Sequence, residues 1–231
     1  MVLTVVLCGA GCSGGKQRGE AVRDSATFAP GSAASQPTGA VGAANRSAAK
    51  TILFLGTSLT AGLGLPSEQA YPQEIQRKID AAHLSYTTVN AGESGETAAG
   101  LLRRLDWVLQ QPASVIVVET GANDALRGQP VTGTMATIDT ILSVITRVQP
   151  GARVVLVQME APPNLGQSYT RDFHAMFPAL AKKHRATLMP FLLQNVAGVA
   201  GLNQGDGIHP NRAGEQIVAS TVWQTLEPLL K

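Results

Sequence analysis

Cysteine is almost absent from this sequence, since Cys8 and Cys12 are the only two and both lie near the N-terminus. They cannot form a disulfide across the body of a fold, nor supply the four ligands of a typical structural metal site. Aromatic residues are also scarce, at 4% of the chain. This scarcity argues against a long cleft in which sugars stack on rings. We expect no metal and no organic cofactor.

Neither sign of charge dominates the sequence. The chain has eighteen Lys and Arg residues and sixteen Asp and Glu residues, for a formal charge of +2. This balance leaves no basic stripe for DNA or RNA, so we expect no nucleic-acid partner. Length and composition instead favour one domain with a sizeable core.

Long hydrophobic runs are missing as well. The apolar run at residues 1–12 is shorter than the roughly 20 residues of a membrane-spanning helix, and it resembles a signal-peptide core. Gly9, Ala10 and Gly11 before Cys12 resemble a bacterial lipoprotein processing box, which implies lipidation of Cys12 and membrane attachment. We expect an exported protein of the periplasm or cell envelope. An ordinary secretory signal or a disordered tail remains the alternative.

Residues 13–50 are rich in Gly, Ala, Ser, Pro and Thr and show no helical or strand periodicity. This composition predicts a disordered linker. As a flexible coil it would reach about 35 Å from an anchor point.

Residues 51–231 alternate between short apolar runs and amphipathic stretches, a pattern typical of α/β proteins with a parallel sheet. Loops at the carboxyl ends of such strands open onto a common crevice, where functional groups collect. The expected strands are 51–55, 87–90, 115–120, 154–158 and 187–189, as apolar runs covered on both faces. The expected helices are 71–82, 97–109, 134–149, 170–184 and 211–229.

Candidate catalytic side chains follow the first strand and precede the last helix. Ser58 lies at a strand-to-helix turn, where a hydroxyl is exposed, although the pentapeptide GTSLT (56–60) alone favours a helix cap. Asp206 lies three residues before His209, a spacing that lets the carboxylate reach the ring and orient it as a base. Turn and cap residues would explain the same spacing.

Two further loops contain groups that can hold an oxyanion. Gly95 follows the second strand and Asn123 the third, and a backbone N–H with an amide can stabilise a tetrahedral intermediate. Each segment taken separately is also a plausible turn.

Together, four ordered blocks resemble the SGNH, or GDSL, hydrolase superfamily: ILFLGTSLTAGLGL (52–65), SGETAAGLLRRL (94–105), VIVVETGANDALRG (115–128) and DGIHPNRAG (206–214). The resemblance covers residues 51–231 and is closest to the thioesterase I and arylesterase branch. It implies a three-layer α/β/α fold with a flavodoxin-like five-stranded parallel sheet.

The same resemblance implies the roles of individual residues. Ser58 is the nucleophile, His209 the general base and Asp206 its orienting carboxylate, and Ser58, Gly95 and Asn123 form the oxyanion hole. Thr57 departs from the usual Gly-Asp-Ser-Leu block, in which an Asp precedes the serine. The triad does not use that Asp, so we expect catalysis to survive.

These residues predict a serine hydrolase that cleaves small acyl or aryl esters or thioesters, of the arylesterase, thioesterase or lysophospholipase type. The loop after the fourth strand borders the acyl groove in the related branch, so we expect substrate contacts from Pro162, Asn164 and Leu165. Two alternatives remain, namely a carbohydrate O-deacetylase with the same triad and an anchored, non-catalytic binding module.

Overall fold

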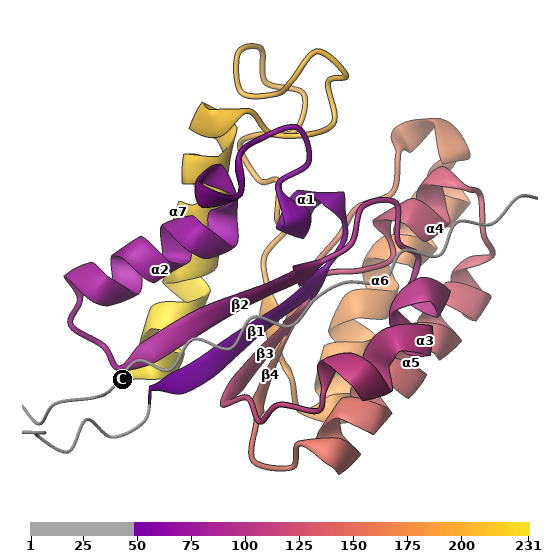
Figure 1. Ribbon diagram of the computed structural model, residues 1–231. Helices are drawn as coiled ribbons and strands as arrows, with labels where there is room; N and C mark the ends of the chain where they lie inside the picture. The colour runs from indigo at the N-terminus through magenta and orange to yellow at the C-terminus, as the bar shows by residue number, and fades with distance from the viewer. Residues whose placement is uncertain (1–48) are drawn as a thin grey trace, which may run out of the picture. The chain divides into compact units, whose positions relative to one another are not determined.

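The computed structural model describes residues 49–231 (Figure 1). The predicted signal segment, most of the predicted linker and Cys12 lie outside the described residues. A five-stranded sheet forms the centre, with strand order β2-β1-β3-β4-β5 and every neighbouring pair parallel. This confirms the predicted three-layer α/β/α fold with a flavodoxin-like sheet. The strands are β1 (Lys50–Gly56), β2 (Tyr86–Gly92), β3 (Val115–Val118), β4 (Arg153–Val157) and β5 (Thr187–Met189).

Buried apolar runs form the middle of the sheet, as their sequences predict. All four residues of β3 are buried, and so are Val155 and Leu156 of β4. β2 differs from the prediction, because it is an edge strand rather than one covered on both faces. Its Val89 is 44% exposed, and none of its seven residues is buried.

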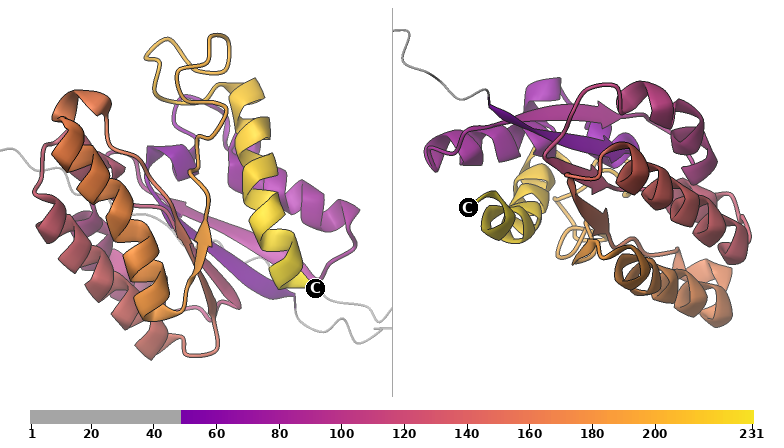
Figure 2. Two further views of the ribbon diagram at one scale, coloured as in Figure 1. Left: turned by 180° about the vertical axis from the view of Figure 1, so that it is seen from behind. Right: turned by 90° about the horizontal axis from the view of Figure 1, so that it is seen from below.

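Helices cover both faces of the sheet, as Figure 2 shows from behind and from below. α2 and α7 pack together on one face, whereas α5 packs against both α3 and α6 on the other. In the expected helix 71–82, the spacing of Ile75, Ile79 and Ala82 predicts a core-facing stripe. Ile75 and Ile79 are fully buried as predicted, whereas Ala82 is exposed because α2 ends one residue before it. These helices are α2 (Tyr71–Ala81), α3 (Ala98–Val108), α5 (Val131–Val148), α6 (Gln167–His184) and α7 (Arg212–Leu230).

Four short helical segments lie in the loops after the strands. They are α1 (Ser58–Ala61), α4 (Ala122–Leu126) and the 3-10 turns η1 (Ser67–Gln69) and η2 (Pro163–Leu165). α1 follows β1 and α4 follows β3, so both begin at the carboxyl edge of the sheet. Within residues 49–231, no helix combines the length and apolar character needed to cross a membrane.

Candidate active site

The turn after β1 presents Ser58. This residue begins α1, while the side chain of Thr57 caps the helix by accepting a hydrogen bond from the Leu59 N–H at 3.5 Å. The capping role that the pentapeptide suggested for Ser58 therefore falls to Thr57. Ser58 is 8% exposed, and its hydroxyl is left for a partner from elsewhere in the chain.

That partner comes from the loop before α7. Asp206 Oδ1 accepts the backbone N–H groups of Ile208 at 2.9 Å and His209 at 3.0 Å, which closes a tight turn. Gly207 between them has a φ of 70°, a left-handed conformation that glycine adopts without strain. Asn211 caps α7 by accepting the N–H groups of Ala213 and Gly214. The turn and the cap together fix where His209 stands.

Ser58, His209 and Asp206 form one hydrogen-bonded chain. His209 Nε2 lies 2.8 Å from Ser58 Oγ, and His209 Nδ1 lies 2.6 Å from Asp206 Oδ2. An ionised carboxylate only accepts, so Nδ1 carries the proton and neutral Nε2 is free to accept from the serine hydroxyl. The ring and the two backbone N–H groups hold the pKa of Asp206 well below its usual range. Asp206 therefore remains ionised at neutral pH.

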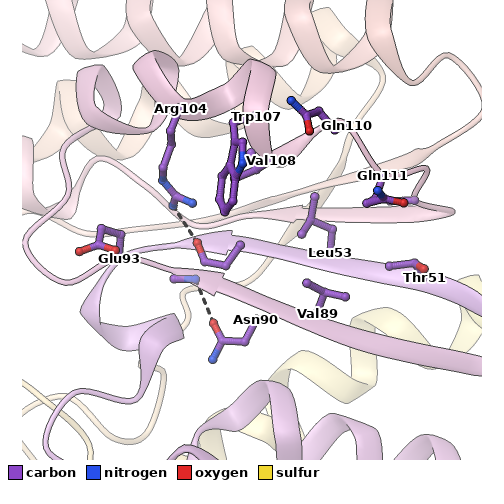
Figure 3. Close-up of a pocket in the computed structure, with 13 residues that line it drawn as sticks. Thr51, Leu53, Val89, Asn90, Glu93, Arg104, Trp107, Val108, Gln110 and Gln111 are labelled. Atoms are coloured by element: carbon purple, nitrogen blue, oxygen red, sulfur yellow. Dashed lines mark hydrogen bonds between the residues drawn. The ribbon is translucent and has the colours of Figure 1, made fainter. Parts of the chain in front are cut away.

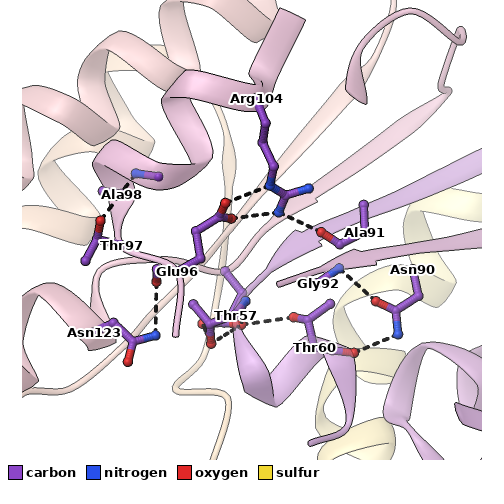
Figure 4. A network of polar contacts seen from close by, with 12 residues as sticks. Thr57, Thr60, Asn90, Ala91, Gly92, Glu96, Thr97, Ala98, Arg104 and Asn123 are labelled. Atoms are coloured by element: carbon purple, nitrogen blue, oxygen red, sulfur yellow. Dashed lines mark hydrogen bonds and ion pairs between the residues drawn. The ribbon is translucent and has the colours of Figure 1, made fainter. Parts of the chain in front are cut away.

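The two oxyanion candidates face this chain from neighbouring loops. Gly95 has a φ of 78°, and among the described residues its N–H meets no acceptor, while its carbonyl accepts from Arg127 Nη2 at 2.8 Å. Asn123 Nδ2 donates to the Glu96 carbonyl at 3.0 Å, as Figure 4 shows. An amide NH₂ has two hydrogens, so this bond fixes its orientation and leaves the other hydrogen available.

The loop that carries Gly95 is held from two helices. From α4, buried Asp124 accepts the Ala98 N–H at 2.8 Å, and burial raises the pKa of Asp124. From α3, Arg104 forms a two-point ion pair with Glu96, at 2.7 Å for both contacts, and also donates to the Ala91 carbonyl (Figure 4). A loop fixed at so many points holds its N–H groups in place before substrate arrives.

A pocket of about 200 Å³ joins these groups. Leu63, Leu126 and Ile208 line it while remaining 45%, 53% and 47% exposed, which gives the pocket an apolar rim open to solvent. The candidate residues Ser58, Gly95, Asn123 and His209 line it together with Thr57, Leu59 and Ala122. Asp206 lies behind His209 and does not line the pocket.

The family model described as the GDSL-like lipase/acylhydrolase family matches residues 54–217. This chain belongs to that family. The GDSL-like hydrolase is 37% identical to the esterase TesA of Pseudomonas aeruginosa over 190 residues, which cover 80% of this chain and 92% of TesA. It is 33% identical to the arylesterase of Vibrio mimicus, over 78% of this chain and 89% of the relative.

Solved structures agree with this assignment. The crystal structure of TesA has a TM-score of 0.74 at 36% identity and covers 78% of this chain and 100% of its own. The psychrotrophic esterase EstA from Pseudoalteromonas sp. also has a TM-score of 0.74, at 33% identity, and covers 78% of this chain and 98% of its own. The fold and the family of the GDSL-like hydrolase are thus established together.

The predicted substrate loop lies apart from the pocket lining. Pro162, Asn164 and Leu165 are not among the residues that line the Ser58 pocket, and Leu165 packs against the hydrophobic core. Their contact with substrate stays a prediction.

Gln204 is a site residue that the sequence did not reveal. Its side-chain Nε2 donates to the Leu63 carbonyl at 2.7 Å and to the Pro210 carbonyl at 2.9 Å, so it ties the His209 loop to the segment after α1. A single Gln in a glycine-rich loop gives no signal of such a bridge in one sequence.

A larger pocket of the GDSL-like hydrolase lies elsewhere, in the groove between α3 and the β1–β2 part of the sheet (Figure 3). It measures about 530 Å³ and runs beneath Trp107, which is 69% exposed, toward Val89 and Leu53. None of the predicted site residues lines it. Choosing the active site by pocket volume alone would therefore miss Ser58.

Proposed function

We propose that this GDSL-like hydrolase cleaves carboxylic esters or thioesters by two-step acyl transfer at Ser58. His209 removes the serine proton as Oγ attacks the carbonyl carbon, and then returns a proton to the leaving alcohol or thiol. Water, activated by the same His209, hydrolyses the acyl-enzyme and regenerates Ser58. Asp206 keeps the imidazole in the required tautomer and stabilises the imidazolium.

The observation that carries this proposal is the continuous chain from Ser58 Oγ through His209 to Asp206, with contacts of 2.8 and 2.6 Å. Family membership supports ester hydrolysis as the class of reaction. The N–H groups of Ser58 and Gly95 and the side chain of Asn123 would hold the oxyanion, an arrangement worth about 10²- to 10³-fold in kcat per donor.

The apolar rim of the pocket supports an acyl or aryl group as the part of the substrate that it binds. Leu63, Leu126 and Ile208 can each be covered by an alkyl chain. Each added CH₂ that is buried is worth about 0.8 kcal/mol, so kcat/KM should rise up to about fourfold per carbon until the pocket is filled. We therefore propose short to medium acyl or aryl esters, and the corresponding thioesters, as substrates.

A chain-length series tests the reaction and the substrate together. p-Nitrophenyl esters and acyl-CoA thioesters of two to sixteen carbons are compared on the wild type, on Ser58→Ala and on Ser168→Ala, an exposed serine of α6. Ser58→Ala should lose at least about 10³-fold in kcat and escape fluorophosphonate labelling, while Ser168→Ala should match the wild type. Unchanged hydrolysis by Ser58→Ala would refute the catalytic assignment.

A carbohydrate O-deacetylase would use the same three residues. The apolar rim favours acyl-chain substrates over glycans, and hydrolysis of an acetylated glycan measured beside the ester series separates the two. Preference for the glycan over every p-nitrophenyl ester would reverse the assignment.

We also propose that the protein is exported and lipidated at Cys12, on the strength of the small residues before it and the apolar run. Growth with labelled palmitate should label the wild type but not Cys12→Ser, with Cys8→Ser as the matched control. Equal labelling of wild type and Cys12→Ser would remove this proposal.

A further inference from the structure

Glu119 is a fully buried carboxylate that the triad does not use. It directly follows β3, where its N–H still donates to the Leu55 carbonyl of β1 at 2.8 Å. Its side chain lies beneath the nucleophile turn. Within residues 49–231, no Lys, Arg or His contacts this carboxylate. A buried carboxylate without a cation is costly, so its hydrogen bonds must account for its presence.

Those hydrogen bonds come from the residues on either side of Ser58. Thr57 donates its N–H to Oε2 at 2.7 Å, and its hydroxyl lies 3.0 Å from both Oε1 and Oε2. Thr60 donates its hydroxyl to Oε2 at 3.0 Å. Since that hydrogen is used, Thr60 Oγ1 accepts from the hydroxyl of buried Tyr71, 2.8 Å away. Figure 4 labels Thr57 and Thr60 and marks the hydrogen bonds of both side chains with dashed lines.

Gly56 shows that the turn is shaped around this carboxylate. A Cβ at residue 56 would lie 2.7 Å from Glu119 Oε2 and 2.0 Å from Thr60 Oγ1. Both distances are far below normal contact, so only glycine lets the carboxylate and the Thr60 hydroxyl approach. Gly56 therefore leaves space for the Glu119 carboxylate. Thr57 and Thr60 donate hydrogen bonds to that carboxylate, and Ser58 lies between them in the turn.

Burial raises the pKa of Glu119, and its bonds to Thr57 and Thr60 oppose that rise. The usual family block has an Asp where this chain has Thr57, which suggested that a negative charge beside the serine was missing. A carboxylate is present nonetheless, supplied by Glu119 directly after β3, and Thr57 is a donor to it. The residue at position 57 and the residue at position 119 thus form one unit.

We propose that Glu119 is a positioning residue that fixes the first turn of α1, and with it both the Oγ and the backbone N–H of Ser58. The inference rests on the proposed role of Ser58. Glu119 accepts a hydrogen bond from the backbone N–H of Thr57 on one side of the turn and from the hydroxyl of Thr60 on the other. Without these hydrogen bonds the first turn of α1 would shift, and Ser58 Oγ would lose its alignment with His209 Nε2. Misplacement by about 1 Å costs on the order of 10²-fold in rate.

The test replaces Glu119 by Met, which has a similar length and no acceptor, and by Gln, which retains one. Glu119→Met should lose about 10²-fold in kcat on p-nitrophenyl butyrate with KM within about threefold, and the rate of Ser58 labelling by fluorophosphonate should fall in parallel. Glu119→Gln should stay within about tenfold of the wild type. The matched control is Gln158→Met, which removes a buried polar side chain at the end of the neighbouring strand β4.

A double-mutant cycle separates positioning from folding. Thr57→Val keeps the shape of Thr57 and removes its hydroxyl, which bonds to Glu119 and also caps α1 through the Leu59 N–H. It should therefore lower kcat in the wild type, and by a clearly smaller factor in Glu119→Met, where only the cap is left to lose. Should Glu119→Met fail to fold, Glu119→Gln serves as the second background and should show a reduced effect of Thr57→Val.

Two results would overturn the inference. One is an equal loss of kcat in Glu119→Met and Gln158→Met after correction for the folded fraction. The other is the same effect of Thr57→Val in every background. Fluorophosphonate labelling of the wild type distinguishes this failure from failure of the proposed function. If only the role of Glu119 is wrong, Ser58 still reacts with the probe. If the proposed function is wrong, Ser58 does not react at all.

Discussion

Asp206 serves two groups through its two oxygens. Oδ1 holds the backbone turn, and Oδ2 holds the ring of His209. The backbone turn needs an acceptor only at Oδ1. Orienting His209 needs an acceptor at the other atom, Oδ2, which faces Nδ1. A side chain of the same shape can therefore preserve the loop and still disable the base.

Asp206→Asn makes that distinction measurable. Its carbonyl oxygen can still accept from Ile208 and His209, but its NH₂ faces Nδ1 and favours the tautomer with the proton on Nε2, which cannot accept from Ser58. We expect kcat to fall by about 10³-fold with little change in KM or melting temperature. Asp172→Asn, an exposed residue of α6, should leave kcat unchanged. A wild-type rate in Asp206→Asn would contradict the tautomer argument.

Gly95 and Gly128 form a natural pair for testing the oxyanion loop. Both have positive φ, 78° and 63°, and a Cβ on either meets no atom closer than 3.9 Å. Alanine at either position should cost about 1 kcal/mol of stability through backbone strain alone. Only Gly95→Ala should also lower kcat, by at least about tenfold, because strain there shifts the proposed oxyanion donor. Thermal unfolding and ester kinetics on both variants decide this, and equal kinetics would count against Gly95.

At the scale of elements, α2 and α7 are joined through a buried acid. Glu215, in the first turn of α7 and 1% exposed, accepts the Tyr71 N–H at the start of α2 at 2.8 Å. Burial, with a smaller contribution from the nearby Glu74 charge, raises the pKa of Glu215 to about 8. The folded protein therefore holds a proton on Glu215 that the unfolded chain releases near pH 4.5.

This proton makes stability depend on pH with a definite sign. The contribution of Glu215 is fully present below about pH 4.5 and is lost as the pH rises toward 8, at up to about 1.4 kcal/mol per pH unit. Glu215→Gln can still accept from Tyr71 but has no proton to lose. As the pH rises from 5.5 to 8.5, the melting temperature of Glu215→Gln should therefore rise relative to that of the wild type. Glu227→Gln, on the same helix, should follow the wild type. Parallel curves for wild type and Glu215→Gln would exclude this titration.

The long elements were predictable from sequence, and the short ones were not. Apolar runs such as 115–118 predict strands, because consecutive apolar side chains must be buried on both faces of the sheet. The predicted strand 115–120 ended two residues too late, since Glu119 and Thr120 follow β3. α1 and α4 have four and five residues, too few to show a helical period, so both read as turns. The i, i+3 spacing of Asp206 and His209 is local and was visible. Glu119 and Thr57 are 62 residues apart, and only the pairing of β1 with β3 brings them together.

For the molecule as a whole, one hydrophobic cluster extends from Ile52 to Leu230 and includes residues of both helical layers. We predict that residues 49–231 fold on their own around this cluster. A chain that begins at residue 49 should melt within about 2 °C of the full protein, since 1 kcal/mol shifts the midpoint of such a domain by about 2–4 °C. Its kcat on short p-nitrophenyl esters should be unchanged. A loss of activity or stability would show that residues 1–48 contribute to the catalytic domain.

β1 also determines which way the catalyst faces. The strand starts at Lys50, where the preceding chain joins, and ends at Gly56 beside Ser58, so its seven residues separate the two by about 20 Å. The C-terminus lies near that same starting edge (Figures 1 and 2). A domain that begins at residue 49 can therefore be attached at either end to a bead, an electrode or a fusion partner while the mouth of the pocket points away from the support. Immobilised through either end, the enzyme would present its reactive edge to the passing solution.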